Sequence, residues 1–205
     1  MSSSEAKKIG LIGRVDPDRT LFDGQTVKTR MMHQLLCEMY GEDRVVVADT
    51  IDWRHRAPRI LADTRRCLRE CDDIVILLSR NGCKALYPVL ARAARRRGKR
   101  IYQNLIGGHL GKDLGQFPKW RGYLSAFKVN WVESHALVDE LASKGVTNAK
   151  YLPNFKFLDA ADVPSTRTYD SNWSLCIFSR VIREKGVADA MEAVEGLSGD
   201  DSGTY

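Results

Sequence analysis

The amino-acid sequence predicts an α/β protein with a mostly parallel sheet and helices on both of its faces. Two observations indicate this fold class. Short apolar stretches alternate about six times with longer stretches in which apolar residues recur at helical spacing. In addition, the stretch 73–79 contains an apolar run without alternation, Ile74 to Leu78, as in a strand that is buried on both faces. This combination is typical of a doubly wound, Rossmann-like sheet.

The predicted elements follow one another from the N-terminus. Residues 8–13 form an apolar run that ends at Gly13, and a helix is expected from Thr26 to Tyr40, where Val27, Met31 and Leu35 repeat at helical spacing. The Gly-, Lys- and Pro-punctuated segment after Gly107 receives no predicted helix. The remaining predicted elements are strands at 44–49, 73–79, 100–106, 127–132 and 150–154, the last at a sheet edge, and helices at 58–71, 82–98 and 134–144.

The order of these elements predicts one whole domain and the opening of another. Residues 1–158 are expected to form the Rossmann-like domain, and the polar residues 159–172 a linker. Residues 173–205 have the pattern of a strand, a basic turn and the start of a helix. An isolated strand and helix bury too little apolar surface to offset their ordering entropy. We therefore expect 173–205 to be the incomplete start of a truncated second domain.

Composition excludes several classes of protein. The chain has 205 residues, 43% hydrophobic and 28% charged, which is ordinary for a globular protein and excludes disorder throughout. Its polar first residues lead into a strand too short for a signal sequence or a membrane span, so a cytoplasmic protein is expected. The five cysteines are odd in number and include no Cys-x-x-Cys pair. Neither a disulfide framework nor a thiolate zinc site is therefore indicated, and reduced, buried thiols are expected.

Positive charge is concentrated in the first half of the chain. Residues 1–100 hold 21 Lys or Arg against 13 Asp or Glu, and residues 101–205 hold 11 against 13. The run at 92–100 could attract anionic lipid head groups, nucleic acid or an anionic substrate, and it predicts peripheral association with anionic membrane surfaces. The alternative is a helix C-terminus whose cations complement the helix dipole before Gly98. Nucleic acid is not expected as a partner, because Tyr102 alone among the aromatic residues lies near the run.

In parallel sheets of this kind, ligands bind outside the carboxyl ends of the strands. The loop after the first predicted strand holds Gly24 and Gln25 at a helix start, where free N–H groups could bind a phosphate. The alternative is an ordinary helix cap made by Asp23 or Thr26. Neither a Walker motif nor a dinucleotide fingerprint is present in this loop, so no nucleotide cofactor is expected.

Two further places hold candidate functional residues. His109 follows two glycines at the end of the fourth predicted strand, and it could donate a hydrogen bond to a sugar hydroxyl or orient a reacting group. Arg180 and Lys185 flank the basic turn before the last predicted helix. Two cations and helix N–H groups there would suit a diphosphate, whereas the alternative is a solvated turn.

The order and spacing of these motifs resemble the family 4 glycosyltransferases of the glycosyltransferase-B fold, in which two Rossmann-like domains face each other across a cleft. The motifs are Asp23-Gly-Gln-Thr, Gly-Gly-His109, Val132-Glu-Ser134-His-Ala-Leu, Leu152-Pro153-Asn154, and Phe178-Ser-Arg180 with Glu184-Lys185-Gly186. The resemblance implies that the N-terminal domain binds the acceptor and the C-terminal domain the nucleotide-sugar. It also implies that Arg180 and Lys185 neutralise the donor diphosphate, that the loop with Gly24 and Gln25 approaches the phosphates from the other side, and that His109 contacts the transferred sugar.

The activity implied by the resemblance is that of a retaining hexosyltransferase-like enzyme of polysaccharide biosynthesis. A metal-independent mechanism is expected, because Arg180, Lys185 and helix dipoles would meet the charge of the leaving group and no Asp-x-Asp motif is recognised. Such an enzyme moves a sugar from a nucleotide diphosphate donor to a glycan or a lipid-linked acceptor. The family's Glu-x7-Glu pair, which grips the sugar and ribose, would lie in the missing part of the second domain, so the chain itself is expected to be inactive. The alternatives are a non-catalytic module that binds a sugar or phosphate, and one half of a split enzyme.

Overall fold

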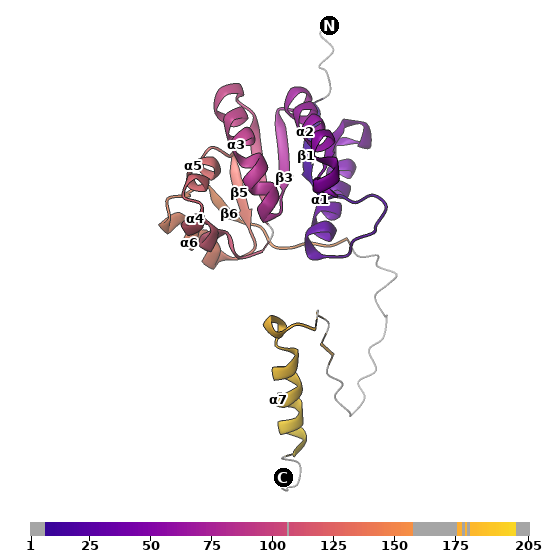
Figure 1. Ribbon diagram of the computed structural model, residues 1–205, viewed down its shortest axis with the longest axis vertical. Coiled ribbons are helices and arrows are strands. Elements are labelled where there is room, and N and C mark those ends of the chain that lie inside the picture. Colours follow the sequence, from indigo (N-terminus) through magenta and orange to yellow (C-terminus); the bar gives the residue numbers. More distant parts are fainter. Residues whose placement is uncertain (1–6, 106, 158–175, 178, 180, 200–205) are drawn as a thin grey trace. The chain divides into compact units, whose positions relative to one another are not determined.

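The computed structural model describes residues 7–105, 107–157, 176–177, 179 and 181–199 (Figure 1). The chain divides into two compact units, Met1–Leu158 and Asp159–Tyr205. The first unit contains the sheet, and each unit is described by itself.

The first unit is built on a six-stranded sheet in which every pair of neighbouring strands is parallel. The strand order is β2-β1-β3-β4-β5-β6, so the direction in which strands are added reverses between β1 and β3. This reversal is the topological switch point of an open α/β sheet. The prediction of a Rossmann-like parallel sheet is therefore confirmed. The strands are β1 (Ile9–Gly13), β2 (Val45–Asp49), β3 (Asp73–Leu77), β4 (Arg100–Asn104), β5 (Val129–Val132) and β6 (Ala149–Tyr151).

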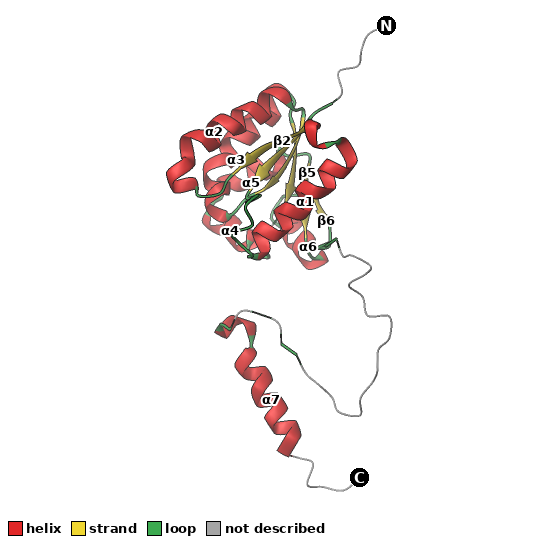
Figure 2. Ribbon diagram, turned by 90° about the vertical axis from the view of Figure 1, so that its right-hand side faces the viewer, coloured by secondary structure: helices red, strands yellow, loops and turns green. Residues whose placement is uncertain are grey.

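Helices cover both faces of this sheet (Figure 2). Alternate residues of each strand point to opposite faces, and they enter two separate cores. On one face Leu11 and Val75 pack with Met32 of α1, and on the other Ile74 and Ile101 belong to the core that the remaining helices of the unit cover. The helices are α1 (Gly24–Tyr40), α2 (Trp53–Glu70), α3 (Arg80–Arg97), α4 (Leu110–Gln116), α5 (Lys119–Ser125) and α6 (His135–Ser143), with a 3-10 turn at Glu42–Arg44.

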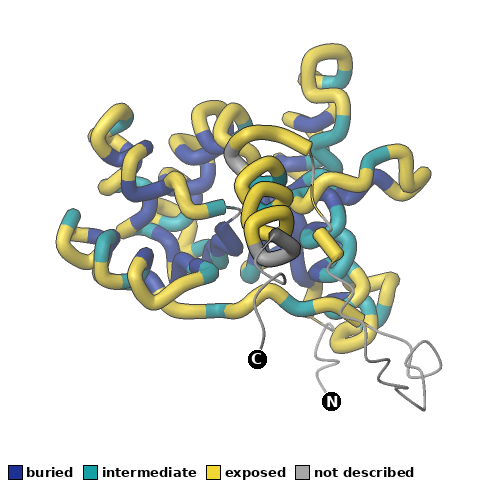
Figure 3. The backbone as a smooth tube through the Cα atoms, turned by 90° about the horizontal axis from the view of Figure 1, so that it is seen from below, coloured by how far each residue is buried: buried dark blue, intermediate teal, exposed yellow. Residues whose placement is uncertain are grey.

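Burial follows the same layers. Seen from below, the buried stretches lie along the strands and the inner helix faces, whereas the outer turns of the helices are exposed (Figure 3). Helix α3 ends at Gly98, whose φ of 65° lies in the left-handed region that glycine adopts without strain. The predicted helix end before this glycine is confirmed.

Two parts of the chain contain more helix than the sequence predicted. Helix α2 begins at Trp53 and includes Pro58, although a helix start at Pro58 was expected. The segment that received no predicted helix forms α4 and α5, two helices of 7 residues each. Leu110 and Leu114 of α4, like Trp120 and Leu124 of α5, are spaced four residues apart and buried in the core. Their burial stabilises helices that are too short to form alone.

The described part of the second unit contains a 3-10 turn at Arg183–Lys185 and the helix α7 (Val187–Gly199). The strand expected from Trp173 to Phe178 falls almost wholly outside the described residues. Cys176 and Ile177, which are described, have no regular secondary structure and are exposed. None of the helices in the described part of the chain combines the length and the apolar character needed to cross a membrane.

Candidate functional site

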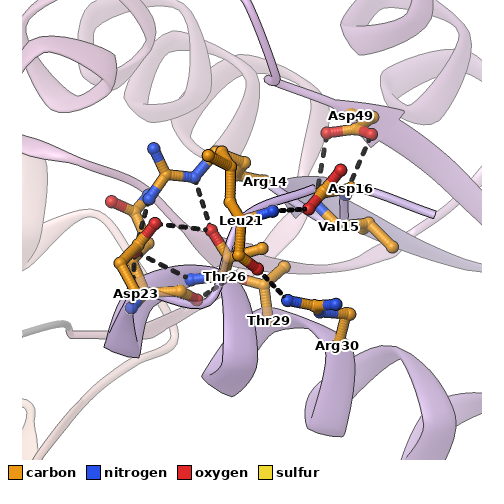
Figure 4. Close-up of polar contacts among 10 residues, drawn as sticks. Arg14, Val15, Asp16, Leu21, Asp23, Thr26, Thr29, Arg30 and Asp49 are labelled. Carbon is orange, nitrogen blue, oxygen red and sulfur yellow. Dashed lines mark hydrogen bonds and ion pairs between the residues drawn. The ribbon is translucent and has the colours of Figure 1, made fainter. Parts of the chain in front are cut away.

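The carboxyl edge of the sheet is organised by the loop between β1 and α1, which begins beside the switch point. The carboxylate of Asp49, at the end of β2, accepts hydrogen bonds from the backbone N–H groups of Val15 (3.1 Å), Asp16 (3.2 Å) and Ile51 (3.0 Å). Figure 4 shows two of these bonds reaching from Asp49 to the start of the loop. Asp49 thus holds the loop against the end of the neighbouring strand.

Asp16 closes the same loop from within. Its side chain is fully buried, and its carboxylate accepts hydrogen bonds from the Leu21 N–H (2.7 Å) and the Thr20 hydroxyl (2.9 Å). Burial raises the pKa of Asp16, but these hydrogen bonds and the charge of Arg30 lower it by more, so the net pKa lies below its ordinary value. The backbone of Asp16 has a φ of 50°, a conformation that only a few per cent of non-glycine residues adopt.

Asp16, Pro17 and Asp18 together form an Asp-x-Asp sequence, a pattern that often binds divalent cations. The expectation that the chain holds no such motif is therefore wrong. In the structure the two carboxylates do not form a pair for a metal, because that of Asp16 is occupied by Leu21 and Thr20. No group of three or more His, Cys, Asp or Glu side chains in the described part of the chain is arranged to hold a metal ion.

The predicted phosphate site at the start of α1 is capped by Asp23. Its carboxylate accepts hydrogen bonds from the backbone N–H groups of Gln25 (3.0 Å) and Thr26 (3.2 Å) and from the Thr26 hydroxyl (3.0 Å), and it pairs with Arg14 (Figure 4). Burial raises the pKa of Asp23, but these hydrogen bonds and Arg14 lower it by more. An ionised carboxylate therefore stands where the sequence placed a phosphate, and a phosphate would have to displace it.

Gly24 and Gln25 form the first turn of α1 beside this cap. Gly24 is exposed, and a Cβ added to it would meet no atom within 4 Å. A ligand could therefore approach the backbone of Gly24 from outside the unit. This open position remains after Asp23 has taken the N–H groups of the next two residues.

Lys28 of α1 connects three elements at the carboxyl edge. Its side chain is only 11% exposed, and its ammonium group donates hydrogen bonds to the Leu105 carbonyl (2.8 Å) and to Glu133 Oε1 (2.7 Å). Leu105 follows β4 and Glu133 follows β5, so this one cation ties α1 to the ends of two distant strands. Sequence reasoning gave Lys28 no role, because nothing near it in the sequence indicates these partners.

His109 lines a cavity of about 350 Å³ at the carboxyl ends of β3 and β4. It lies at the residue before α4, and its exposed side chain makes no hydrogen bond to any described residue. The cavity combines a buried apolar floor with charged and amide side chains. Its lining residues are Leu78, Arg80, Cys83, Leu105, His109, Leu110, Lys112, Asp113, Gln116 and Trp120.

Arg80 and Asp113 form the polar wall of this cavity. A guanidinium nitrogen of Arg80 lies 2.7 Å from Asp113 Oδ1 and also donates to Gln116, while the guanidinium carbon lies 5.3 Å from the centre of the Phe117 ring. Asp113 is nearly buried and Arg80 is about half exposed. The wall can therefore donate and accept hydrogen bonds at one place, which suits a ligand that carries hydroxyl groups.

A second, larger cavity of about 580 Å³ lies between the β1–α1 loop and α1. It is lined in part by Cys37 and His33, whose Sγ and Nε2 atoms are 3.5 Å apart. Burial and the nearby Glu42 raise the pKa of Cys37, so the group remains a thiol at neutral pH. The pair therefore lacks the thiolate that nucleophilic catalysis requires.

The predicted site residues are brought together only in part. Three of them lie at the carboxyl edge of the first unit: Gly24 and Gln25 in the first turn of α1, after the β1–α1 loop, and His109 in the loop after β4. Lys185 belongs to the second unit, where it ends the 3-10 turn before α7 and is exposed. Arg180 lies outside the described residues.

A scan of the chain against protein-family models finds no match, and searches of the curated proteins and of the solved structures find none either. The residues at the carboxyl edge therefore carry the functional argument.

Proposed function

We propose that the first unit is the acceptor-binding domain of a retaining glycosyltransferase, and that the second unit contributes to binding the phosphates of a nucleotide-sugar donor. The observation that carries the proposal is the cavity of about 350 Å³ at the carboxyl ends of β3 and β4, with His109 at its lining. Its position agrees with the general rule that ligands of open α/β sheets bind outside the carboxyl ends of the strands.

The chemistry of the lining supports a sugar as the ligand. Hydroxyl groups both donate and accept hydrogen bonds, and the cavity supplies acceptors in Asp113 and Gln116 and donors in Arg80 and Lys112. His109 has no competing partner among the described residues and is free to bond a sugar hydroxyl. In the proposed role it positions the sugar while the bond between the sugar and the nucleoside diphosphate breaks and the bond to the acceptor oxygen forms, with the proton of the acceptor hydroxyl passing to the departing diphosphate.

The departing nucleoside diphosphate carries negative charge that the protein has to stabilise. We assign this role to Lys185, with Arg180, and to the backbone at the start of α7. The phosphate-binding role of Gly24 and Gln25 requires the Asp23 carboxylate to leave the N-terminus of α1, because it accepts the N–H groups of Gln25 and Thr26. The donor phosphates then replace one anion by another at the same helix terminus.

A second candidate function is a module that binds a sugar without chemistry. The Asp23 cap favours this alternative, because a capped α1 leaves the sugar cavity intact and removes the phosphate site at Gly24. In this case the cavity lined by His109 would bind a free sugar or glycan, and no nucleotide-sugar would be consumed.

Substitution of His109 separates these functions. Because the chain itself is expected to be inactive, a form of the protein that carries a complete second domain is titrated with a panel of nucleoside diphosphate sugars in a chelator-containing buffer. Sugar release or transfer is followed with the same panel. We expect binding without a divalent ion, and His109→Ala should lower turnover by about 100-fold while sparing affinity for the free nucleoside diphosphate. His55→Ala, an exposed histidine of α2, is the matched control and should change neither quantity.

Three results would decide against the proposal. An absolute requirement for a divalent ion would contradict the metal-independent mechanism. An equal loss of turnover in the His109 and His55 variants would contradict the assignment of the sugar-binding role to His109. Binding of free sugars with no consumption of any nucleotide-sugar would support the non-catalytic module instead.

A further inference from the structure

A basic groove runs between α3 and α5, away from the cavity lined by His109. It has a volume of about 480 Å³ and is lined by Pro88, Val89, Ala91, Arg92, Arg95, Arg96 and Tyr123. Three guanidinium groups thus line it, and no carboxylate does. Helix α3 contains six Lys or Arg residues and no Asp or Glu over its whole length.

Some cations of the basic run at 92–100 form ion pairs in the structure, and others do not. Lys99 pairs with Asp72 at 2.9 Å, and Arg100 pairs with Asp73 at the amino edge of the sheet. Arg92 and Arg96, by contrast, have neither a hydrogen bond nor an ion pair to any described residue. Two of the unpaired cations therefore line the groove, whereas Arg97, which is also unpaired among the described residues, lies outside its lining.

Arg95 is held in place at the wall of the groove. Its guanidinium donates a hydrogen bond to the Gly122 carbonyl of α5, which fixes the side chain between the two helices. An arginine whose position is fixed loses less entropy when it binds an anion than a free one does. The groove therefore contains one positioned and two free guanidinium groups.

The basic surface continues along the two helices beyond this groove. A neighbouring hollow of about 370 Å³ is lined by Lys84, Pro88, Gln116, Phe117, Pro118, Lys119, Trp120 and Tyr123, again without a carboxylate. Cations that line a long strip of one surface produce a positive potential that attracts an extended anionic partner. An isolated anion would need only one of these hollows.

The aromatic side chains of the strip distinguish a membrane from single-stranded nucleic acid. Phe117 is stacked on Trp120 with ring centres 4.7 Å apart, and the ammonium nitrogen of Lys84 lies 4.9 Å from the centre of the Phe117 ring. Tyr123 is half-buried and packs against the core. Single-stranded nucleic acids bind on aromatic rings that are free to stack on bases, and these rings are not free.

We propose that the α3–α5 groove binds the phosphate headgroups of an anionic lipid bilayer through Arg92, Arg95 and Arg96. Val89 lies at the groove with 38% of its surface exposed, and it offers an apolar contact to the boundary between headgroups and acyl chains. The proposal does not depend on the proposed sugar chemistry, because the groove shares no lining residue with the cavity that holds His109.

Co-sedimentation with vesicles tests the proposal on the full chain. The vesicles are phosphatidylcholine alone or with about one fifth phosphatidylserine at low salt, because each cation near an anionic surface adds about 1 kcal/mol. The double variant Arg92→Gln/Arg96→Gln should lower the partition constant for anionic vesicles by about 30-fold on the same scale. It should unfold like the wild type, because neither side chain has a partner to lose.

A matched variant elsewhere controls for net charge. Arg44→Gln/Lys156→Gln removes two exposed cations outside the groove, and it should leave the partition constant nearly unchanged. Binding of the wild-type chain should weaken as salt is raised, since salt screens charges beyond about 10 Å at 0.1 M. Equal partition into neutral and anionic vesicles, or an equal loss in the control variant, would overturn the proposal.

Two competition experiments identify the source of the phosphate. Soluble pyrophosphate at millimolar concentration should not release the chain from vesicles, because it cannot span the strip. Release by pyrophosphate would show a site for a free phosphate compound instead of a bilayer. Tighter binding to a single-stranded RNA oligonucleotide than to anionic vesicles would likewise overturn the assignment of a lipid partner.

Discussion

Asp73 holds charged groups together at the amino edge of the sheet. Its carboxylate accepts hydrogen bonds from Arg100 (2.6 Å from Nη2) and from the Tyr102 hydroxyl (3.2 Å), and it also pairs with Lys7. The hydrogen bonds from Arg100 lower the pKa of Asp73 more than any other interaction does, and they outweigh the burial that raises it. They hold the pKa of Asp73 well below its usual value of 3.8.

This residue predicts loss of stability in acid. Because the folded pKa is depressed, Asp73 stabilises the fold above the unfolded pKa, and this contribution is lost as the pH falls from about 4 through the lower folded pKa. We expect Asp73→Asn to cost about 1 kcal/mol at neutral pH, since Arg100 is partly exposed and water screens the pair.

Urea unfolding between pH 7 and pH 2 measures this effect. The difference between wild type and Asp73→Asn should shrink as the pH falls below about 4, because the unfolded wild-type chain then binds a proton at Asp73 that the folded chain binds only at lower pH. Asp18→Asn, which changes an exposed carboxylate without a resolved partner, is the control and should show a small difference at every pH. A constant difference for Asp73→Asn across the whole range would contradict the assignment.

At the scale of elements, the packing of α1 on the sheet depends on Gly13. A Cβ at this position would lie 2.9 Å from the Leu77 carbonyl oxygen of β3 and 2.9 Å from Thr29 Cγ2 of α1. Both contacts are closer than real side chains allow, and one of them is with backbone. The last residue of β1 is therefore small because two elements meet over it.

Gly13→Ala is accordingly expected to destabilise the first unit by about 1–3 kcal/mol, the usual cost of overpacking. Gly115→Ala in α4 is the matched control, because an added Cβ there would meet no atom within 4 Å. In a helix this control change should be neutral or stabilising by up to about 1 kcal/mol. Thermal unfolding of the two variants compares them, and equal effects would show that α1 does not press on β1 as described.

At the scale of the whole molecule, both apolar cores are contained in the first unit. The core on the α1 face and the larger core on the opposite face draw all their buried members from residues between Ile9 and Ala149. The 3-10 turn at Arg183–Lys185 and α7, both in the second unit, supply no buried residue to either core. Residues 1–158 therefore contain the apolar burial that a domain of this size needs to fold.

A fragment of residues 1–158 is predicted to fold cooperatively, with a thermal midpoint within about 2 °C of that of the full chain. Leu141→Ala, which removes a fully buried side chain, should cost about 2–5 kcal/mol in the fragment and in the full chain alike. Calorimetry of the four proteins measures both effects. A fragment that does not unfold cooperatively, or a Leu141 effect that differs between the two backgrounds, would contradict this prediction.

The sequence by itself determined the fold class and the positions of most of the strands of the sheet. The apolar run within 73–79 and the cap residue Ser134 are local signals, and the structure contains the strand Asp73–Leu77 and the helix start after Ser134 that they predict. The helix predicted from Gly82 begins two residues earlier, at Arg80, with Ser79 as its cap. The placement of Gly24 at a helix start and of His109 in a loop, both at the carboxyl edge, also followed from the alternation of strands and helices. Their proposed chemical roles remain predictions.

Only the tertiary structure decided which distant groups meet. Lys28 and Glu133 are 105 positions apart in the sequence and form one ion pair, and Asp49 holds a loop that precedes it by more than 30 residues. Helices α4 and α5 likewise form because the core buries their leucines. This burial outweighs the low helix propensity of the glycines within them and of the proline before α5. Local pattern fixes the backbone conformation of neighbouring residues, whereas contacts between distant residues depend on strand order and packing, which no short stretch of sequence encodes.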